Sequence, residues 1–251
     1  GLERGRFTFH LTSTLEDQAR ALVKYAQANL AAADQKIAIL ASDDGAGLNV
    51  GDAIHRQGHS AQRAPALSLR LTASTSVADI AWRLRRAAVS IIFYDGGPAR
   101  LAALAEEADK WGWRPAILTT TLAVTAESLA RLGKAGIRVF VAYPTLTSDQ
   151  SPEALKLLYL LRAAYNIPDR HLSMQVAALA SARVLVEGLQ RVGRDLTRPK
   201  FVAALLTLQN FETGLMPPIS FGPNQRTGIR GAHIVTLSSG PAATLAWISL
   251  D

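Results

Sequence analysis

The chain has 251 residues, enough for one large domain or two small ones with a well-buried core. Apolar residues make up 49% of it and charged residues 19%, a composition that excludes an intrinsically disordered chain. Because there is no cysteine, disulfides, thiolate chemistry and cysteine-built zinc sites are excluded as well. The formal charge of +7 comes from scattered basic residues without interleaved aromatic residues, so we expect no nucleic-acid partner.

Membrane and export signals are not visible in the sequence. The longest uninterrupted apolar runs, such as VSIIFY (89–94), are much shorter than the roughly 20 residues of a membrane-spanning helix. No segment has the basic start, apolar middle and small-residue cleavage site of a signal peptide. A signal that has already been removed would leave no trace, so export remains compatible with the sequence.

Residues 36–143 alternate apolar strands with amphipathic helices. We expect strands at 36–41, 63–69, 89–95, 115–120 and 137–143, and helices at 47–56, 76–87, 98–112 and 126–133. Thr75 or Ser74 is placed to cap the helix at 76–87, Pro98 opens the next helix, and Gly133 is expected to end the last one. Apolar strands separated by helices predict a doubly wound α/β fold around a parallel sheet.

The binding edge of such a sheet lies at the carboxyl ends of its strands. The residues that follow the expected strands there are mostly polar or small. We therefore expect a ligand to contact Asp43, Asp44, Tyr94, Asp95, Gly97, Thr119, Thr120, Thr121 and Tyr143. Of these, Asp44, Tyr94 and Asp95 are the strongest candidates.

The pattern changes after Tyr143. Three consecutive helices are expected, at 152–165, 172–192 and about 198–209. They cannot all cover a sheet that already has its own helices, so at least one of them should pack on something else. An FGPN turn at 221–224 then leads into two short apolar strands, which predict a C-terminal β-hairpin at the sheet edge.

No catalytic motif is complete. Gly45 and Gly47 fit a dinucleotide-binding G-x-G-x-x-G motif, but Val50 takes the place of the third glycine, and no acidic residue follows the next strand. His55 and His59 have the helical spacing of a metal pair but no carboxylate partner at useful spacing. We therefore expect a binding module and not an enzyme, with no metal and no cofactor.

Four segments occur in the order seen in a known family. They are RFTFHLTSTLEDQARALVKYA (6–26), KIAILASDDGAGL (36–48), the helix–strand–helix of 76–113, and FETGLMPPISFGPNQRTGIRGAHIVTL (211–237). They resemble the periplasmic substrate-binding proteins of branched-chain amino acid ABC importers, which have the type I periplasmic-binding-protein fold. The last segment is the most specific, because it is similar to the late TG-x-x-GP-x-x-F-x-x-N-G segment of that family.

The resemblance implies a division of the chain. Residues 1–12 would be a crossover between two lobes and residues 13–143 the second lobe. Residues 144–210 would be helices that return towards the first lobe, and 211–251 a hinge crossing with the C-terminal strands. The first lobe itself would lie largely outside this sequence, and the helix at 172–192 would pack on its strands.

The resemblance also implies a function. An extracytoplasmic solute-binding protein would capture a small ligand by hinge closure and deliver it to an inner-membrane permease. We expect a monomer in the periplasm, or a lipoprotein on the outer face of the cytoplasmic membrane. The same fold also serves in ligand-sensing receptors and regulators, which a signalling segment in the full gene would indicate. Binding of NAD(H) would instead indicate a nucleotide-dependent enzyme.

The expected cleft differs from the amino-acid-binding pattern of the family. Asp44 stands where the family has a Tyr before G-x-G, Gly97 and Pro98 stand where it has aromatic residues, and Thr121 or its neighbour stands where a Glu would hold the ligand ammonium. Small residues widen the site, so we expect a bulkier or less polar ligand, and a lipid-like one is conceivable. Alternatively, Asp44 and Asp95 replace the Glu and hold an amino acid or amide.

Overall fold

The computed structural model describes residues 7–30, 35–59, 64–237 and 243–250, which belong to two compact units. Unit 1 consists of Gly1–Ser13 and Pro144–Arg230, and unit 2 consists of Thr14–Tyr143 and Gly231–Asp251. The segment 211–251, which we expected as one region, is thus divided after Arg230. Residues 1–6 of the expected crossover lie outside the described residues.

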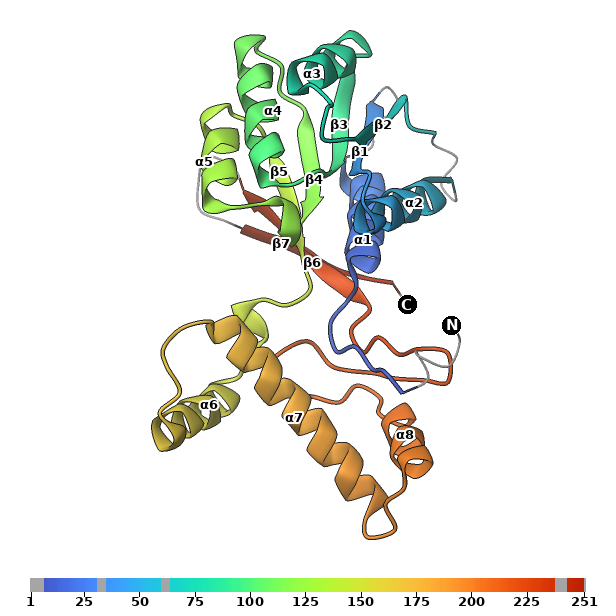
Figure 1. The fold of residues 1–251 in the computed structure, drawn as a ribbon, viewed down its shortest axis with the longest axis vertical. Coiled ribbons are helices and arrows are strands. Elements are labelled where there is room, and N and C mark those ends of the chain that lie inside the picture. Colours follow the sequence, from blue (N-terminus) through green and yellow to red (C-terminus); the bar gives the residue numbers. More distant parts are fainter. Residues whose placement is uncertain (1–6, 31–34, 60–63, 238–242, 251) are drawn as a thin grey trace. The chain divides into compact units, whose positions relative to one another are not determined.

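Unit 2 is built on a sheet of seven strands within the described residues (Figure 1). The strands are β1 (Lys36–Ser42), β2 (Leu67–Leu71), β3 (Val89–Asp95), β4 (Ala116–Thr120), β5 (Val139–Tyr143), β6 (Gly231–Leu237) and β7 (Ala243–Ser249). Their order is β2-β1-β3-β4-β5-β6-β7. The first five strands in this order are parallel, and β6 and β7 add an antiparallel hairpin at one edge, as expected.

Helices cover both faces of this sheet, which confirms the doubly wound α/β fold. On one face lie α1 (Leu15–Asn29) and α2 (Gly45–His59), and on the other lie α3 (Val77–Arg86), α4 (Pro98–Lys110) and α5 (Ala126–Lys134). Each face has its own core, because side chains alternate along a strand. Phe93 and Leu118 point into the core under α1 and α2, whereas Tyr94 and Ile117 point into the other.

Several element boundaries differ from expectation for local reasons. The strand expected at 63–69 is β2, at Leu67–Leu71, and pairs with β1 from Leu67 onwards. Ser76 caps α3 by accepting from the backbone of Asp79, whereas the hydroxyl of Thr75 accepts from the backbone of Thr72. The helix α5 does not end at Gly133 but runs to Lys134.

Unit 1 contains the three expected helices and an irregular C-terminal segment. They are α6 (Pro152–Tyr165), α7 (Leu172–Val192) and α8 (Arg198–Leu206), of which only α8 is shorter than expected. The irregular segment pairs with itself between Phe211 and Ile219 and turns tightly between Gly222 and Gln225, at the predicted FGPN turn. Residues 10–11 run beside 226–229, bonded through His10 to Arg226 and Gly228.

The helix α7 is packed on one side and apolar on the other. Val176, Ala180, Val184 and Gly188 are buried in unit 1, and Arg183 donates to the carbonyl oxygen of Thr213. The opposite side leaves large apolar side chains exposed, among them Leu172, Met174, Leu185, Val186 and Leu189. By length and composition alone α7 is apolar enough to cross a membrane, contrary to the expectation that no segment would be. Its buried side and the Arg183 bond attach it to unit 1.

Candidate functional site

The residues expected to contact a ligand lie at the carboxyl ends of β1, β3, β4 and β5. We call this part of unit 2 the carboxyl edge. Asp43 and Asp44 follow β1, Tyr94 and Asp95 end β3, Thr119 and Thr120 end β4, and Tyr143 ends β5. Gly97 precedes α4, and Thr121 begins the short 3-10 helix η1 (Thr121–Ala123). Because β1, β3, β4 and β5 are parallel neighbours, these ends meet at the same edge of the sheet.

Asp44 organises the first turn of α2. Its Oδ1 accepts a 2.7 Å hydrogen bond from the backbone N–H of Gly47, in the manner of a helix cap. Gly47 lies directly against the end of β1, where an added Cβ would come within 2.5 Å of the carbonyl oxygen of Ser42. Asp44 is exposed, so one of its carboxylate oxygens can still meet a ligand. Asp43 is exposed too.

Tyr94 and Thr119 face the core under α3, α4 and α5. The side chain of Tyr94 is only 2% exposed, and its hydroxyl donates a 2.8 Å hydrogen bond to the carbonyl oxygen of Gly97. Thr119 donates through Oγ1 to the carbonyl oxygen of Tyr94 at 2.8 Å. Burial raises the pKa of Tyr94, which stays a neutral hydroxyl. Both side chains brace the turn between β3 and α4, and their contact with a ligand stays a prediction.

Asp95 has a different environment from its neighbours. It is half-buried on the α1 and α2 face, beside Ala41 in the adjacent strand. The described residues provide it with no ion pair and no side-chain hydrogen bond. Burial raises its pKa, and the charge of Asp44 raises it further. Among the residues that the structure describes, none forms an ion pair that compensates the charge of Asp95.

Thr120 lies next to Asp95 on the same face. Tyr94 pairs with Thr119 across the two strands, so the following residues, Asp95 and Thr120, are neighbours as well. Thr120 is 2% exposed, and its Oγ1 has no hydrogen-bond partner in the described part of the chain. A buried hydroxyl without a partner costs free energy, so such groups commonly serve a ligand or a water molecule.

The loop after β4 adds an apolar residue that sequence reasoning missed. Leu122, in η1, is 65% exposed, and η1 contacts β3, α4 and β5. An apolar residue directly after the polar Thr119–Thr121 run was the available signal. Tyr143, half-buried at the end of β5, has its pKa raised by burial. The edge therefore combines hydroxyl and carboxylate groups with an exposed aliphatic side chain.

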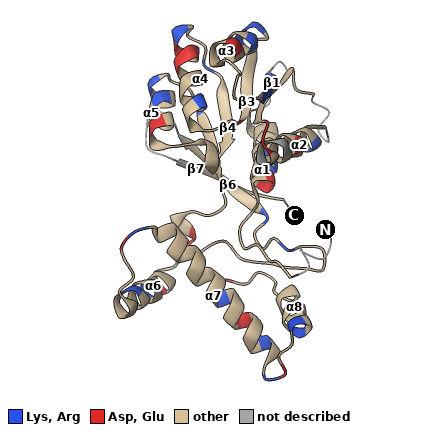
Figure 2. Cartoon of the chain, in the orientation of Figure 1, with Lys and Arg blue, Asp and Glu red and all other residues tan. Residues whose placement is uncertain are grey.

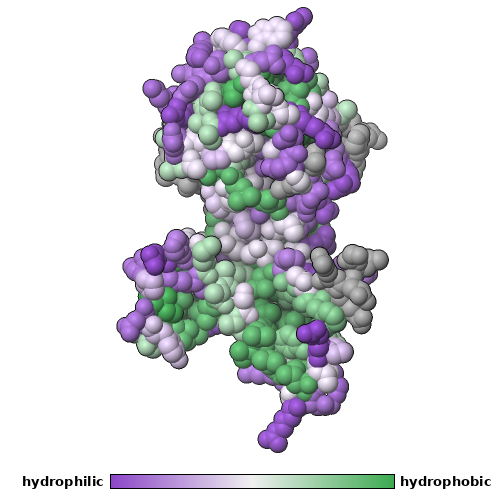
Figure 3. Space-filling view, in the orientation of Figure 1, coloured by the Kyte–Doolittle hydropathy of each residue, from purple (hydrophilic) through white to green (hydrophobic). Residues whose placement is uncertain are grey.

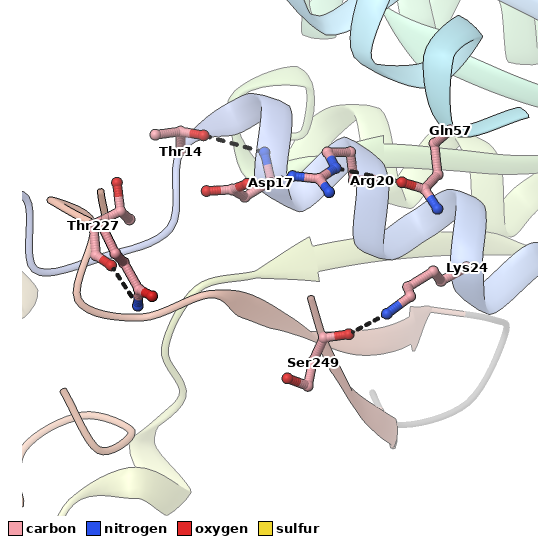
Figure 4. A network of polar contacts seen from close by, with 8 residues as sticks. Thr14, Asp17, Arg20, Lys24, Gln57, Thr227 and Ser249 are labelled. Atoms are coloured by element: carbon pink, nitrogen blue, oxygen red, sulfur yellow. Dashed lines mark hydrogen bonds and ion pairs between the residues drawn. The ribbon is translucent and has the colours of Figure 1, made fainter. Parts of the chain in front are cut away.

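Polar contacts hold α1 in place over the face of the sheet on which Asp95 and Thr120 lie (Figure 4). The Thr14 hydroxyl accepts from the backbone of Asp17 and caps α1, Arg20 donates to Gln57 of α2, and Lys24 donates to the carbonyl oxygen of Ser249 in β7. The C-terminal end of α1 shares a cavity with the amino ends of β3 and β4. The N-terminal turn of α1 is therefore directed towards the carboxyl edge.

Two cavities in unit 2 lie away from the carboxyl edge. The cavity at the amino ends of the strands measures about 360 Å³ and is lined by Asn29, Gln35, Ser90, Arg138 and neighbouring residues. A smaller apolar cavity of about 30 Å³ lies between α1, α2 and the sheet, lined by residues such as Ile39, Ile54 and Phe93. The smaller one has the volume of a single water molecule and cannot hold an organic ligand.

Neither the charged groups nor the possible metal ligands of the described residues form a second candidate site for a small ligand. Figure 2 shows Lys and Arg distributed over helices of both units, with Asp and Glu among them. In the described residues no group of three His, Asp or Glu side chains is placed to hold a metal ion. The side chain of His59, considered above with His55, lies outside the described part.

Replacing Asp95 by asparagine should stabilise the protein at neutral pH. A carboxyl whose pKa is raised by folding lowers stability once the pH exceeds its ordinary pKa, because the folded state then holds an unfavourable charge. We expect Asp95→Asn to raise the melting temperature at pH 7, because it removes that charge from a half-buried position. Calorimetry at pH 3, where the carboxyl is protonated, should show no gain. A gain at both pH values would contradict this reasoning.

The comparisons with known proteins agree with one another. A model of the periplasmic binding protein family matches residues 1–242. No match was found among curated proteins. Several hundred solved chains are similar, 516 in number, and the first of them share between 12% and 18% of their residues with this chain.

Three of these structures illustrate the range of similarity to this chain. A branched-chain amino acid ABC transporter protein from Thermus thermophilus with bound valine has a TM-score of 0.72 at 15% identity, over 97% of this chain and 67% of that one. A putative branched-chain amino acid ABC transporter protein from Rhodospirillum rubrum has 0.78 at 12%, over 96% and 68%. A fatty acid ABC transporter substrate-binding protein from Thermomonospora curvata has 0.71 at 18%, over 98% and 65%. The fold is therefore the type I periplasmic-binding-protein fold.

Proposed function

The chain belongs to the periplasmic binding protein family, and we propose that it is the extracytoplasmic solute-binding component of a membrane transporter. The observation that supports this most is Asp95, a half-buried carboxyl at the carboxyl edge for which the described residues provide no ion pair and no side-chain hydrogen bond. Among the described residues of this edge, the printed side-chain hydrogen bonds join no nucleophile to a base, so binding explains the edge better than catalysis. The site would lie in the periplasm, or on a lipoprotein outside the cytoplasmic membrane.

In this proposal the ligand is captured by closure of two lobes. Unit 2 would be the second lobe, and residues 7–12 and 211–230 would belong to the crossings between lobes. The pairing of residues 10–11 with 226–229 supports it, because it joins two of the proposed crossings side by side. The closed, monomeric protein would then present its ligand to an inner-membrane permease.

The ligand would be bulkier or less polar than a plain amino acid. Gly97 and Pro98 leave space at the start of α4, and Leu122 offers an exposed aliphatic side chain at the same edge. A pocket for a small molecule usually combines apolar lining with a few placed polar groups, and this edge fits that description. If a branched-chain amino acid or amide is recovered from the protein, the proposal of a bulkier ligand is wrong and the protein binds an amino acid or amide.

We further propose that the helices of unit 1 cover the first lobe. The exposed side of α7 forms a continuous hydrophobic surface on the face seen in Figure 3, which a monomeric protein rarely leaves uncovered. About a third of the length of the relatives described above lies outside the part matched here. A sheet in that additional part would bury Leu185, Val186 and Leu189.

Cysteine labelling of the full-length protein tests whether the first lobe buries the exposed side of α7. Residues 1–251 have no cysteine, so Val186→Cys and the control Ala78→Cys would each supply a thiol at a known place. Val186 is 49% exposed on α7 in this structure, and Ala78 is exposed on α3. We expect a maleimide to modify position 186 at least about tenfold more slowly than position 78, because opening of the packed lobe must come first. Equal rates would show that α7 faces solvent.

The function itself is tested on the full-length protein purified from its own source. Native mass spectrometry should show a bound small molecule, and organic extraction should release it for identification. Adding it back should reduce the radius of gyration measured by small-angle X-ray scattering, because the lobes close. A protein that carries no ligand and binds none from an extract of its source would not be a solute-binding protein.

A further inference from the structure

The amino ends of the parallel strands of unit 2 lie at the edge of the sheet opposite the carboxyl edge, and we call this part the amino edge. The helices α3, α4 and α5 end there, because each of them leads back to the start of the next strand. We infer that the amino edge is a docking surface for a membrane that carries anionic phospholipids. Such docking goes beyond the solute binding proposed above, since it uses the other edge of the sheet.

Basic residues gather at the amino edge. The last turns of α3, α4 and α5 all contain Lys or Arg, and Figure 2 shows these segments at the top of the view. Lys36 begins β1, and Arg138 directly precedes β5. The helix dipole accounts for basic residues in the last turn of a helix. It does not account for Lys36 and Arg138, which lie outside the helices.

Ion pairs leave the amino edge with a surplus of positive charge. The carboxylates of α3, α4 and α5 are all engaged in ion pairs with Lys or Arg side chains of the same three helices or of the residues after them. Five exposed basic side chains at this edge form no ion pair with a described residue, namely Lys36, Arg85, Arg86, Lys134 and Arg138. Basic residues gathered without counter-ions attract an anionic surface.

Tryptophan adds an apolar contact to this charge. Three of the four tryptophans of the chain lie at or within one turn of the amino edge, and Trp82 is 49% exposed. The guanidinium of Arg86 lies 5.1 Å from the centroid of the Trp82 ring, and that of Arg85 lies 5.4 Å from the centroid of Trp111. Tryptophan is enriched at the level of lipid head groups, and arginine binds phosphate through two N–H groups. Charge alone would fit any polyanion, whereas this combination fits a phospholipid surface.

The carboxyl edge of the same unit lacks such a surplus. Asp43, Asp44 and Asp95 form no ion pair with a described residue there, and they offset the charges of Arg70 and Arg100. An anionic membrane would therefore attract unit 2 by its amino edge. The candidate solute site would stay free, and a protein that serves a permease works beside a membrane surface.

Vesicle binding by the full-length protein tests this docking. Vesicles of phosphatidylcholine are compared with vesicles that also contain about 30% phosphatidylglycerol, an anionic lipid. At about 0.1 M salt we expect binding to the anionic vesicles to be at least about tenfold tighter. The difference should disappear at about 1 M salt, where the Debye length is only about 3 Å. A lipid anchor would insert into both kinds of vesicle, so the comparison reports the effect of the head groups.

Charge variants assign the binding to the amino edge. The double variant Arg85→Gln with Arg86→Gln should bind the anionic vesicles about 25-fold more weakly, because each basic residue near such a surface contributes about fivefold. Arg138→Gln should weaken binding about fivefold and serves as an independent variant on another element. The control, Arg170→Gln with Arg194→Gln, removes the same charge from exposed positions of unit 1. It should change binding by less than about twofold, since only the overall charge is altered.

Trp82→Ala tests the apolar contact separately from the charge. We expect weaker binding to the anionic vesicles, because less apolar surface enters the head-group layer. The salt dependence should stay as in the parent protein, since no charge is removed. Circular dichroism should show the parent fold in every variant, because all the substituted side chains are exposed.

Four outcomes would overturn the docking proposal. They are equal binding to both kinds of vesicle, a preference for anionic vesicles that survives in Arg85→Gln with Arg86→Gln and in Arg138→Gln, an equal loss in the control, and unchanged binding of Trp82→Ala. Retention on heparin without vesicle binding would assign the edge to a soluble polyanion and overturn the proposal as well. Vesicle binding needs no solute, so failure of the solute-binding function would be seen separately, as absence of a recovered ligand.

Discussion

Replacing Gly47 by alanine should lower the melting temperature of unit 2 by about 6–12 °C. The added Cβ would lie 2.5 Å from the carbonyl oxygen and 2.9 Å from the backbone nitrogen of Ser42, and backbone atoms cannot rotate away. Overpacking of this kind costs about 3 kcal/mol, and each kcal/mol lowers the melting temperature by about 2–4 °C in a chain of this size. The first turn of α2 would have to move, taking the bond between Gly47 and Asp44 with it.

Gly45 provides the matched control for this prediction. It opens the same helix, but a Cβ added there would have no neighbour within 4 Å. Gly45→Ala should therefore change the melting temperature by no more than about 2 °C, since only helix propensity is altered. If thermal denaturation shows the same change for both variants, the close approach of Gly47 to β1 is not what determines stability here.

Replacing Gly214 by alanine should disrupt the junction between the C-terminal segment of unit 1 and α6. Gly214 has a φ of 67°, and an added Cβ would lie 2.8 Å from Ser151 Oγ and 3.2 Å from the Cβ of Ala154. The left-handed conformation costs about 1–2 kcal/mol for alanine, and the contact with Ala154 adds to it. We expect a loss of about 2–4 kcal/mol, measured by urea denaturation, and a weaker hydrogen bond from Ser151 to Gly214.

A variant at Gly112 distinguishes the cost of the left-handed conformation from the cost of the contact with Ala154. Its φ of 60° is nearly the same, but an added Cβ would have no neighbour within 4 Å. Gly112→Ala should therefore cost only the conformational part, about 1–2 kcal/mol. Were Gly112→Ala as damaging as Gly214→Ala, the packing of Gly214 against α6 would contribute nothing measurable.

The fold was predictable where local signals and periodicity agree. The helices expected at 152–165 and 172–192 are α6 and α7, with the same bounds; Ser151 caps α6 ahead of Pro152, and Gly193 follows the end of α7. The cap of α3 was predicted wrongly, because Thr72, Ser74, Thr75 and Ser76 lie close together and any of their hydroxyls can accept a backbone N–H. The choice depends on the turn that precedes the helix, which composition does not specify.

The candidate site was predictable in location but not in detail. A doubly wound sheet places Asp44, Asp95 and Thr120 at one edge whatever the identity of the helices around them. Whether a hydroxyl at that edge forms a hydrogen bond within the protein depends on its neighbours in the adjacent strands. Thr119 donates to the carbonyl oxygen of Tyr94, whereas the adjacent Thr120 faces the other side and has no partner in the described chain. The sequence TTT contains no sign of that difference.

The exposed apolar residues of α7 show a similar limit of prediction from sequence. Periodicity predicts an amphipathic α7 only if one side is polar, yet this helix carries apolar residues on its packed side and on its exposed side. Its sequence is therefore compatible with a membrane span, a buried helix or a helix between two layers. The hydrogen bond of Arg183 to Thr213 and the burial of Gly188 favour the last, since they attach one side to unit 1.

We propose that this protein binds its solute at the carboxyl edge of the unit 2 sheet. The most direct measurement is an amide NMR titration of the deuterated, ¹⁵N-labelled full-length protein with the ligand recovered from its source. Binding at this edge should shift the amides of residues 95–97 and 120–122. The amides around the amino-end cavity, at Asn29, Ser90 and Arg138, should not shift. Shifts concentrated at the amino-end cavity, with none at Asp95 and Thr120, would contradict it.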